Sequence, residues 1–235
     1  MSEVKLEKTK QKKLKGASKA IYVIAKIGRV FTIIGVAFMI LGIAMGIGFV
    51  NSINLKDDNT IEMKYNDASI QVRELSDDVE IVSNGESVKL DDAEATTAIK
   101  YAINILKNNS KTNIMLFLII TAAFTIASMV LLIIILKRVE ELFRNIHDND
   151  TPFTVENIDL IKKITYFMIA ATIVPIVGNM ISSLFMPTEA EGFDMNFGYS
   201  LIAILAVYCL GFVFEYGYEI QQNANSRIYG DDNNE

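Results

Sequence analysis

The chain has 235 residues, of which 51% are hydrophobic, and a formal net charge of −6. Soluble domains reach a similar apolar fraction, so composition alone excludes neither a soluble nor a membrane protein. The single cysteine, Cys209, excludes an intramolecular disulfide and a zinc site built from several cysteines. The distribution is more informative, because the apolar residues lie in four long blocks with the charges almost entirely between them.

The four blocks are long enough to cross a membrane as helices. A bilayer core about 30 Å thick requires roughly 20 mostly apolar residues in helical form, and residues 30–50, 112–136, 164–186 and 199–220 meet that length. The first block is about twice as long as the ~7–15-residue apolar region of a signal peptide, which favours a retained anchor. We therefore predict a membrane all-α fold: a four-transmembrane-helix bundle with a small α+β extracytoplasmic domain, residues 51–111, between transmembrane helices 1 and 2.

Lysine and arginine near the ends of the blocks predict the orientation. The tail 1–29 and the segment 137–163 are rich in both, whereas the loop 187–198 has no basic residue and three acidic ones, Glu189, Glu191 and Asp194. Because basic residues are retained on the cytoplasmic side, we expect a multi-pass protein of the bacterial plasma membrane with both termini, including the tail 221–235, in the cytoplasm. The clustered lysines of the first tail are expected to attract anionic lipid at about 1 kcal/mol each, and no direct nucleic acid binding is predicted.

The outer domain is predicted to combine a small antiparallel sheet with one helix. Apolar residues alternate over 61–65, 70–72, 79–81 and 88–90, and Asn84-Gly85 between the last two runs is typical of a tight hairpin. A helix follows, capped by Asp91 or Asp92. Its apolar stripe is expected to pack on the sheet: Ala95, Ala98, Ile99, Ala102, Ile103 and Leu106. The domain is either a ligand or partner sensor or a spacer that shapes the outer face. Its acidic pairs lack the alternation of a calcium loop, and we predict no cofactor.

The segment 137–163 is predicted to form a helical hairpin near the inner membrane surface. A helical stripe continues beyond the second apolar block and breaks at residues 147–150. Pro152 then fits either the first position of the next helix, after Thr151, or the turn before a cap at Thr154. The only histidine, His147, stands beside acidic neighbours whose side chains rarely converge, so no metal site is predicted.

Two stretches, NDTPFTVENIDLIKKI at residues 149–164 and FEYG at 214–217, carry a resemblance. They are similar to the signature of an uncharacterised four-pass bacterial membrane family, catalogued as domain of unknown function 2975. The tail departs from the family at Ile220, where leucine is usual, and at Asn223 and Asn225, where acids are usual. The resemblance implies four spans, no established activity, and a cytoplasmic helix-turn-helix regulator as a candidate partner. Such a partner would bind the hairpin and the tail through Phe153, Thr154, Glu156, Asn157, Gln221 and Gln222.

Polar side chains within the apolar blocks are candidate functional groups, because such groups are costly in a membrane. They are Glu215, Glu219 and Asn179. Glu215 is either the coupling group of a transporter or a residue at the inner boundary that bonds a tyrosine or a backbone group, with Lys26 or Arg29 as a further candidate partner. Asn179 is expected to hydrogen-bond a neighbouring helix.

Other positions are predicted to serve helix packing. Gly42 and Gly46 have the spacing that lets two membrane helices approach closely. Pro175 removes one backbone donor within its helix and predicts a kink. Close approach of the glycines is compatible with a homo-oligomer as well as with packing inside one chain.

These observations favour a non-enzymatic bacterial membrane sensor or regulatory protein that couples the outer domain to a cytoplasmic partner. Two alternatives stay open: an ion or small-solute transporter or transporter subunit, and a structural or assembly protein that oligomerises. No enzyme activity and no catalytic residue are predicted, because no serine, cysteine or histidine has a base and an orienting group nearby in the sequence.

Overall fold

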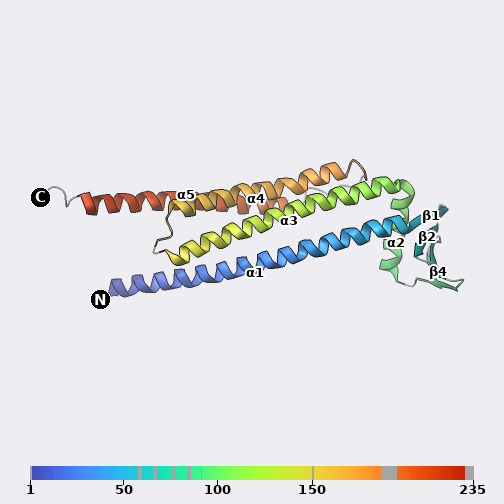
Figure 1. Ribbon diagram of the computed structural model, residues 1–235, viewed down its shortest axis with the longest axis horizontal. Coiled ribbons are helices and arrows are strands. Elements are labelled where there is room, and N and C mark those ends of the chain that lie inside the picture. Colours follow the sequence, from blue (N-terminus) through green and yellow to red (C-terminus); the bar gives the residue numbers. More distant parts are fainter. Residues whose placement is uncertain are drawn as a thin grey trace. The chain divides into compact units, whose positions relative to one another are not determined.

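The computed structural model describes residues 2–57, 60–65, 68–75, 78–83, 86–90, 92–149, 151–186 and 195–230. Their elements follow one another along the chain (Figure 1) as α1 Ser2–Ser52, β1 Ile53–Asp57, β2 Thr60–Tyr65, β3 Ala68–Glu74, β4 Val79–Ser83, β5 Glu86–Lys89, α2 Ala93–Asn108, α3 Lys111–Asp148, α4 Val155–Ser182 and α5 Met195–Gly230.

Four of these helices are long and apolar enough to cross a membrane. The candidate spans lie at residues 9–52 of α1, 111–148 of α3, 155–182 of α4 and 198–224 of α5. The four helices form a bundle, and a five-stranded antiparallel sheet with α2 is inserted between α1 and α3. The predicted four-helix membrane fold with an α+β insert is therefore confirmed.

The helices extend well past the apolar blocks. The predicted basic tail 1–29 is helical from Ser2 and forms the first part of α1, because lysine favours helix and no proline interrupts the segment. Residues 195–198, predicted as part of a loop, belong to α5, and α5 continues through residues 221–230 of the predicted tail. The acidic residues of the predicted loop 187–198, at positions 189, 191 and 194, lie outside the described residues.

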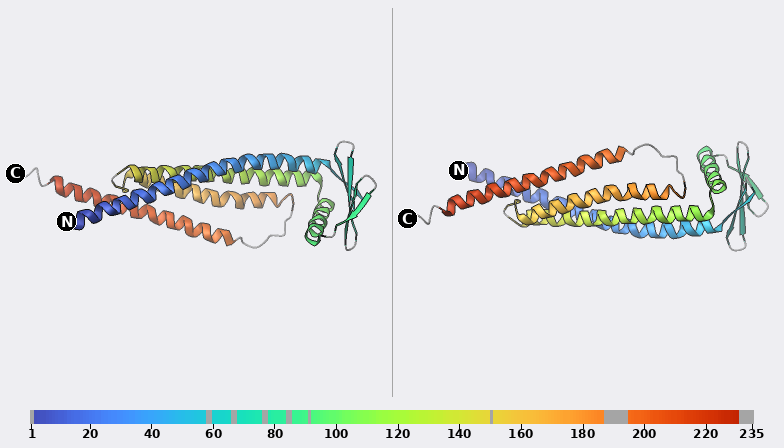
Figure 2. Two further views of the ribbon diagram at one scale, coloured as in Figure 1. Left: turned by 90° about the horizontal axis from the view of Figure 1, so that it is seen from below. Right: turned by 90° about the horizontal axis from the view of Figure 1, so that it is seen from above.

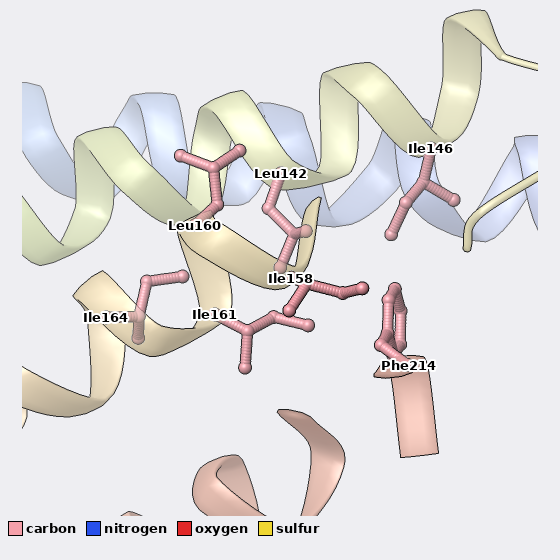
Figure 3. Close-up of a cluster of buried hydrophobic side chains, with 7 residues drawn as sticks. All are labelled: Leu142, Ile146, Ile158, Leu160, Ile161, Ile164 and Phe214. Carbon is pink, nitrogen blue, oxygen red and sulfur yellow. The ribbon is translucent and has the colours of Figure 1, made fainter. Parts of the chain in front are cut away.

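The chain forms two compact units, which we treat separately: a bundle unit of residues 1–37, 124–177 and 191–235, and an insert unit of residues 38–123 and 178–190. In the bundle unit, α3 and α4 form the predicted helical hairpin, and α5 packs against both (Figure 3). The buried side chains of this core come from all three helices: Leu142, Ile146, Ile158, Leu160, Ile161, Ile164 and Phe214. The stripe predicted to continue beyond the second apolar block thus forms the α3 side of this core.

The sheet of the insert unit is an antiparallel meander in the order β1-β2-β3-β4-β5. The alternation predicted β2 to β5 correctly, and Ser83 pairs with Glu86 across Asn84-Gly85, which itself lies outside the described residues. The first strand, β1, was not predicted. It pairs with β2 through Ile53↔Met63 and neighbouring residues.

One face of the sheet packs on α2, seen beside it in Figure 2. Asp92, one of the two predicted caps, accepts hydrogen bonds at Oδ1 from the backbone N–H groups of Glu94 (2.9 Å) and Ala95 (3.1 Å). The buried core consists of Ile53, Ile61, Val72, Val79 and Ile103, with Ile99 and Leu106 packed at its side. The predicted stripe was too wide: Ala98 and Ala102 are exposed, since only the 99–103–106 line of α2 meets the sheet.

Candidate functional site

The connection between α3 and α4 is built around a helix cap and a buried amide. Thr154 caps α4, because its hydroxyl accepts a hydrogen bond from the backbone N–H of Asn157 at 3.2 Å. The Asn157 side chain is fully buried, and its Nδ2 donates to the carbonyl of Pro152 at 2.8 Å. Of the two placements open for Pro152, the structure shows the turn before the cap. This local network fixes the path of the loop independently of any partner.

The same loop is docked on α5 through an aromatic side chain. The ring of Phe153 meets the ring of Phe214 edge-on, with centroids 5.4 Å apart and planes at 72°. One turn along α5, a Cβ on Gly217 would lie only 2.6–2.8 Å from three atoms of the Phe153 ring. Glycine at position 217 therefore provides the space into which the Phe153 ring fits.

A polar contact continues this line along α5. Thr151 Oγ1 donates to Oε1 of Gln221 at 2.9 Å, and Tyr218 packs at the side of the α3–α4–α5 core. Positions 214, 217, 218 and 221 recur with the spacing of one helix face. We call this arrangement, residues 151–157 against residues 214–221, the docked loop.

Ion pairs also join described helices of the bundle unit. Lys162 of α4 pairs with Glu215 of α5 at a Nζ–Oε1 distance of 2.5 Å, and both side chains are partly exposed. Arg29 of α1 approaches Glu140 of α3 to 3.0 Å, and the Glu140 side chain is only 12% exposed. The candidates Lys26 and Arg29 are not the basic partner found: Glu215 pairs with Lys162, and Arg29 pairs with Glu140 on a different helix.

The structure brings some of the predicted partner-binding residues into internal contacts. Phe153, Thr154 and Asn157 hold the docked loop together, and Gln221 is half-buried against it. Glu156 and Gln222 are exposed, so these two are accessible for a partner. Direct contact of a partner with the fully buried Asn157 would require the loop to open.

The remaining predicted positions are Glu219, Asn179, Pro175, Gly42 and Gly46. Glu219 is exposed on α5 and Asn179 on α4, and Pro175 is exposed inside α4, which is helical on both sides of it. A Cβ on Gly42 or Gly46 would meet no atom within 4 Å. Neither glycine therefore makes a close helix contact with the described part of this chain.

Sequence reasoning missed the residues that complete the docked loop. Gly217 was noted only within the FEYG stretch, and Thr151 and Lys162 were given no role in a site. Asn157 stands three residues after Thr154, where its backbone N–H can bond the capping hydroxyl. This spacing could have indicated that Asn157 makes contacts inside the protein. Among the described residues, no group of three histidine, cysteine or acidic side chains is arranged to hold a metal ion.

Comparisons with known proteins gave no match, whether against protein-family profiles, curated proteins or solved structures.

Proposed function

We propose that this protein is a non-enzymatic membrane regulator in which the α+β insert acts on the end of the bundle that carries the docked loop. One observation supports the proposal above the others: α1 ends at Ser52 and β1 begins at Ile53, with no connecting residue. On the other side of the insert, α2 ends at Asn108 and α3 begins at Lys111. A displacement of the sheet or α2 therefore acts directly on helices, and not on a flexible linker.

The docked loop is the element that would receive this displacement. α3 leads into the loop, and the loop is fixed on α5 by Phe153, Gly217 and Thr151. A shift of α3 relative to α5 must strain or release these contacts. Release would expose the Phe153 ring and the buried Asn157 amide beside Glu156 and Gln222, which are already accessible.

We further propose that the docked loop and both termini are cytoplasmic and the insert is extracytoplasmic. Support comes from the lysines of the first part of α1 and from the basic residues that flank the loop, including Arg144, Lys162 and Lys163. A cytoplasmic protein partner would then meet the exposed side chains Glu156 and Gln222. A bacterial origin and a helix-turn-helix partner belong to the same proposal and rest on the resemblance in residues 149–164.

A thiol-reactivity experiment tests the coupling. Glu156→Cys, in a Cys209→Ser background, reports the state of the docked loop in proteoliposomes. Ile103→Ala unpacks the insert core, where Ile103 is fully buried, and Val88→Ser is the matched control at an exposed position of the same insert. We expect Ile103→Ala to change the labelling rate at position 156 several-fold and Val88→Ser to leave it unchanged.

A second change separates coupling through the helix from a general loss of structure. Insertion of Gly-Gly-Gly between Ser52 and Ile53 adds the linker that the structure lacks. The effect of Ile103→Ala on labelling should shrink in this background. If Ile103→Ala and Val88→Ser give the same rate without the insertion, the proposed coupling is refuted.

The structure gives less support to a transporter. The carboxylate of Glu215 is engaged with Lys162, and the two charges neutralise each other. One observation favours self-association of the protein: the space over Gly42 and Gly46 is open. Self-association is compatible with a regulatory role.

A further inference from the structure

A hollow of about 250 Å³ lies between the first part of α1 and the last turns of α3. Its lining consists of Lys19, Tyr22, Arg144, His147 and Asp148. All five belong to the bundle unit. None of them takes part in the contacts of the docked loop, and a ligand in this hollow goes beyond the function proposed above.

The lining offers two cationic donors for an anion and has hydrogen-bond acceptors beside them. Lys19 contributes an ammonium group and Arg144 a guanidinium, which can hold two oxygens of a phosphate at once. Nδ1 of His147 lies 3.1 Å from the carbonyl oxygen of Lys15. A carbonyl can only accept, so Nδ1 carries the proton, and Nε2 of the neutral ring is an acceptor that can meet a ligand hydroxyl.

Asp148 gives this cationic site a second property. An ionised carboxylate only accepts hydrogen bonds, so it repels a bare phosphate and favours a ligand that brings a hydroxyl group next to its phosphate. The Tyr22 hydroxyl can donate or accept. Together the groups match a polyol phosphate better than an inorganic anion.

The position of the hollow along the helices places it near lipid headgroups. Arg144 follows Leu136, the last residue of the second apolar block, by eight positions, roughly 12 Å at ~1.5 Å per residue. The headgroup zone extends roughly 5–8 Å beyond each face of the hydrocarbon core. A long arginine or lysine side chain can reach back across the remaining distance.

We propose that this hollow binds a polyol phosphate, with Lys19 and Arg144 on the phosphate oxygens and with His147 Nε2 and Asp148 accepting from polyol hydroxyls. Two sources present this chemistry: the phosphoglycerol headgroup of an anionic lipid and soluble glycerol phosphate. Because the hollow joins α1 to α3, an occupant holds these two helices together.

The test uses the full chain in phosphatidylcholine nanodiscs doped with phosphatidylglycerol, with the lipid retained per protein measured by native mass spectrometry. Lys19→Gln/Arg144→Gln removes two lining charges. The control, Lys12→Gln/Lys13→Gln, removes two charges from exposed positions of α1 that do not line the hollow. Both variants lose two charges, so the general attraction of anionic lipid falls alike in both. Only the lining variant also loses direct charge-assisted hydrogen bonds to the phosphate, so we expect it to bind phosphatidylglycerol at least about tenfold more weakly than the control. Equal affinities of the two variants would overturn the proposal.

The Asp148→Asn variant tests the hydroxyl contact. The unmodified chain should prefer phosphatidylglycerol to phosphatidic acid, which has no polyol, and the variant should lose that preference. An unchanged preference would overturn the assignment of Asp148.

Soluble glycerol 3-phosphate, titrated into phosphatidylcholine-only discs, distinguishes the two sources. Binding that depends on Lys19 and Arg144 supports a soluble ligand. Lining-dependent retention of phosphatidylglycerol, with no response to glycerol phosphate, supports a lipid. These results stand apart from the labelling experiment at position 156, so failure of the ligand site leaves the regulatory proposal intact, and the reverse also holds.

Discussion

The contact between Gly217 and Phe153 predicts that a single added methyl group destabilises the bundle. In Gly217→Ala the new Cβ would lie 2.6–2.8 Å from ring atoms of Phe153, well inside normal van der Waals separation. Overpacking of this kind costs about 1–3 kcal/mol. Replacing glycine with alanine inside a helix returns about 0.5–1 kcal/mol. The net expectation is a loss of about 1–2 kcal/mol in the free energy of unfolding.

The same helix supplies a matched control. In Gly211→Ala the Cβ would meet Cγ2 of Ile161 at 3.6 Å, an ordinary contact. This variant gains the higher helix propensity of alanine without a clash. It should therefore be as stable as the unmodified protein or more stable by about 0.5–1 kcal/mol. The two substitutions have identical chemistry and differ only in what the methyl group touches.

Unfolding in mixed micelles by SDS titration, read by pulse proteolysis, measures both free energies. A double-mutant cycle adds Phe153→Ala, which removes the ring. Because Phe153 is half-buried, this change alone should cost about 2–3 kcal/mol, less than the 3–5 kcal/mol typical of a fully buried phenylalanine. In that background Gly217→Ala should become neutral or stabilising. The reasoning is refuted if Gly217→Ala is as benign as Gly211→Ala, or if its cost persists without the Phe153 ring.

Three further predictions use the same assay or a mass measurement. Asn157→Ala removes the buried amide that holds the loop carbonyl and should cost about 1–3 kcal/mol; an unaltered SDS midpoint would contradict the role assigned to it. Glu140→Gln leaves the partly buried Arg29 without its charged partner, and an unpaired buried charge is costly. This variant should therefore lose more unfolding free energy than the double variant Arg29→Gln/Glu140→Gln; a larger loss in the double variant would contradict the importance of the ion pair. Gly42→Leu/Gly46→Leu should not destabilise the monomer, since no described atom outside the helix's own backbone lies within 4 Å of either Cβ and glycine is a poor helix former. A fall in the molecular mass of the detergent-solubilised protein, measured by light scattering, would place the glycines in an interface between copies.

The spans and most of the sheet could be predicted because their signals are local. Four apolar blocks and the two-residue alternation in β2 to β5 are readable over a few neighbouring residues. β1 was missed although Ile53 and Leu55 alternate, because the run follows a membrane span directly and its pairing with β2 is what defines it. The predicted apolar stripe on α2 included too many residues for a related reason. Helical spacing shows which residues share a face, but the sheet that packs on α2 decides how much of that face is buried.

The contacts of the docked loop could not be predicted because they join distant parts of the chain. Nothing near Glu215 in sequence indicates Lys162, and nothing near Arg29 indicates Glu140. Phe153 was recognised as important from its sequence context, but its use against Gly217 depends on the packing of α5. A glycine in a membrane helix is common, and only the neighbour that fills its space distinguishes a required glycine from an incidental one.

The direct junction of α1 with β1 also limits how the chain can change in length. An α-helix turns by about 100° per residue, so one residue inserted into α1 would rotate the attachment point of β1 by about 100° relative to the residues of α1 that contact α3. An insertion of seven residues, close to two full turns, would nearly restore the original direction. Tolerated length changes in this helix should therefore be in phase with its turns.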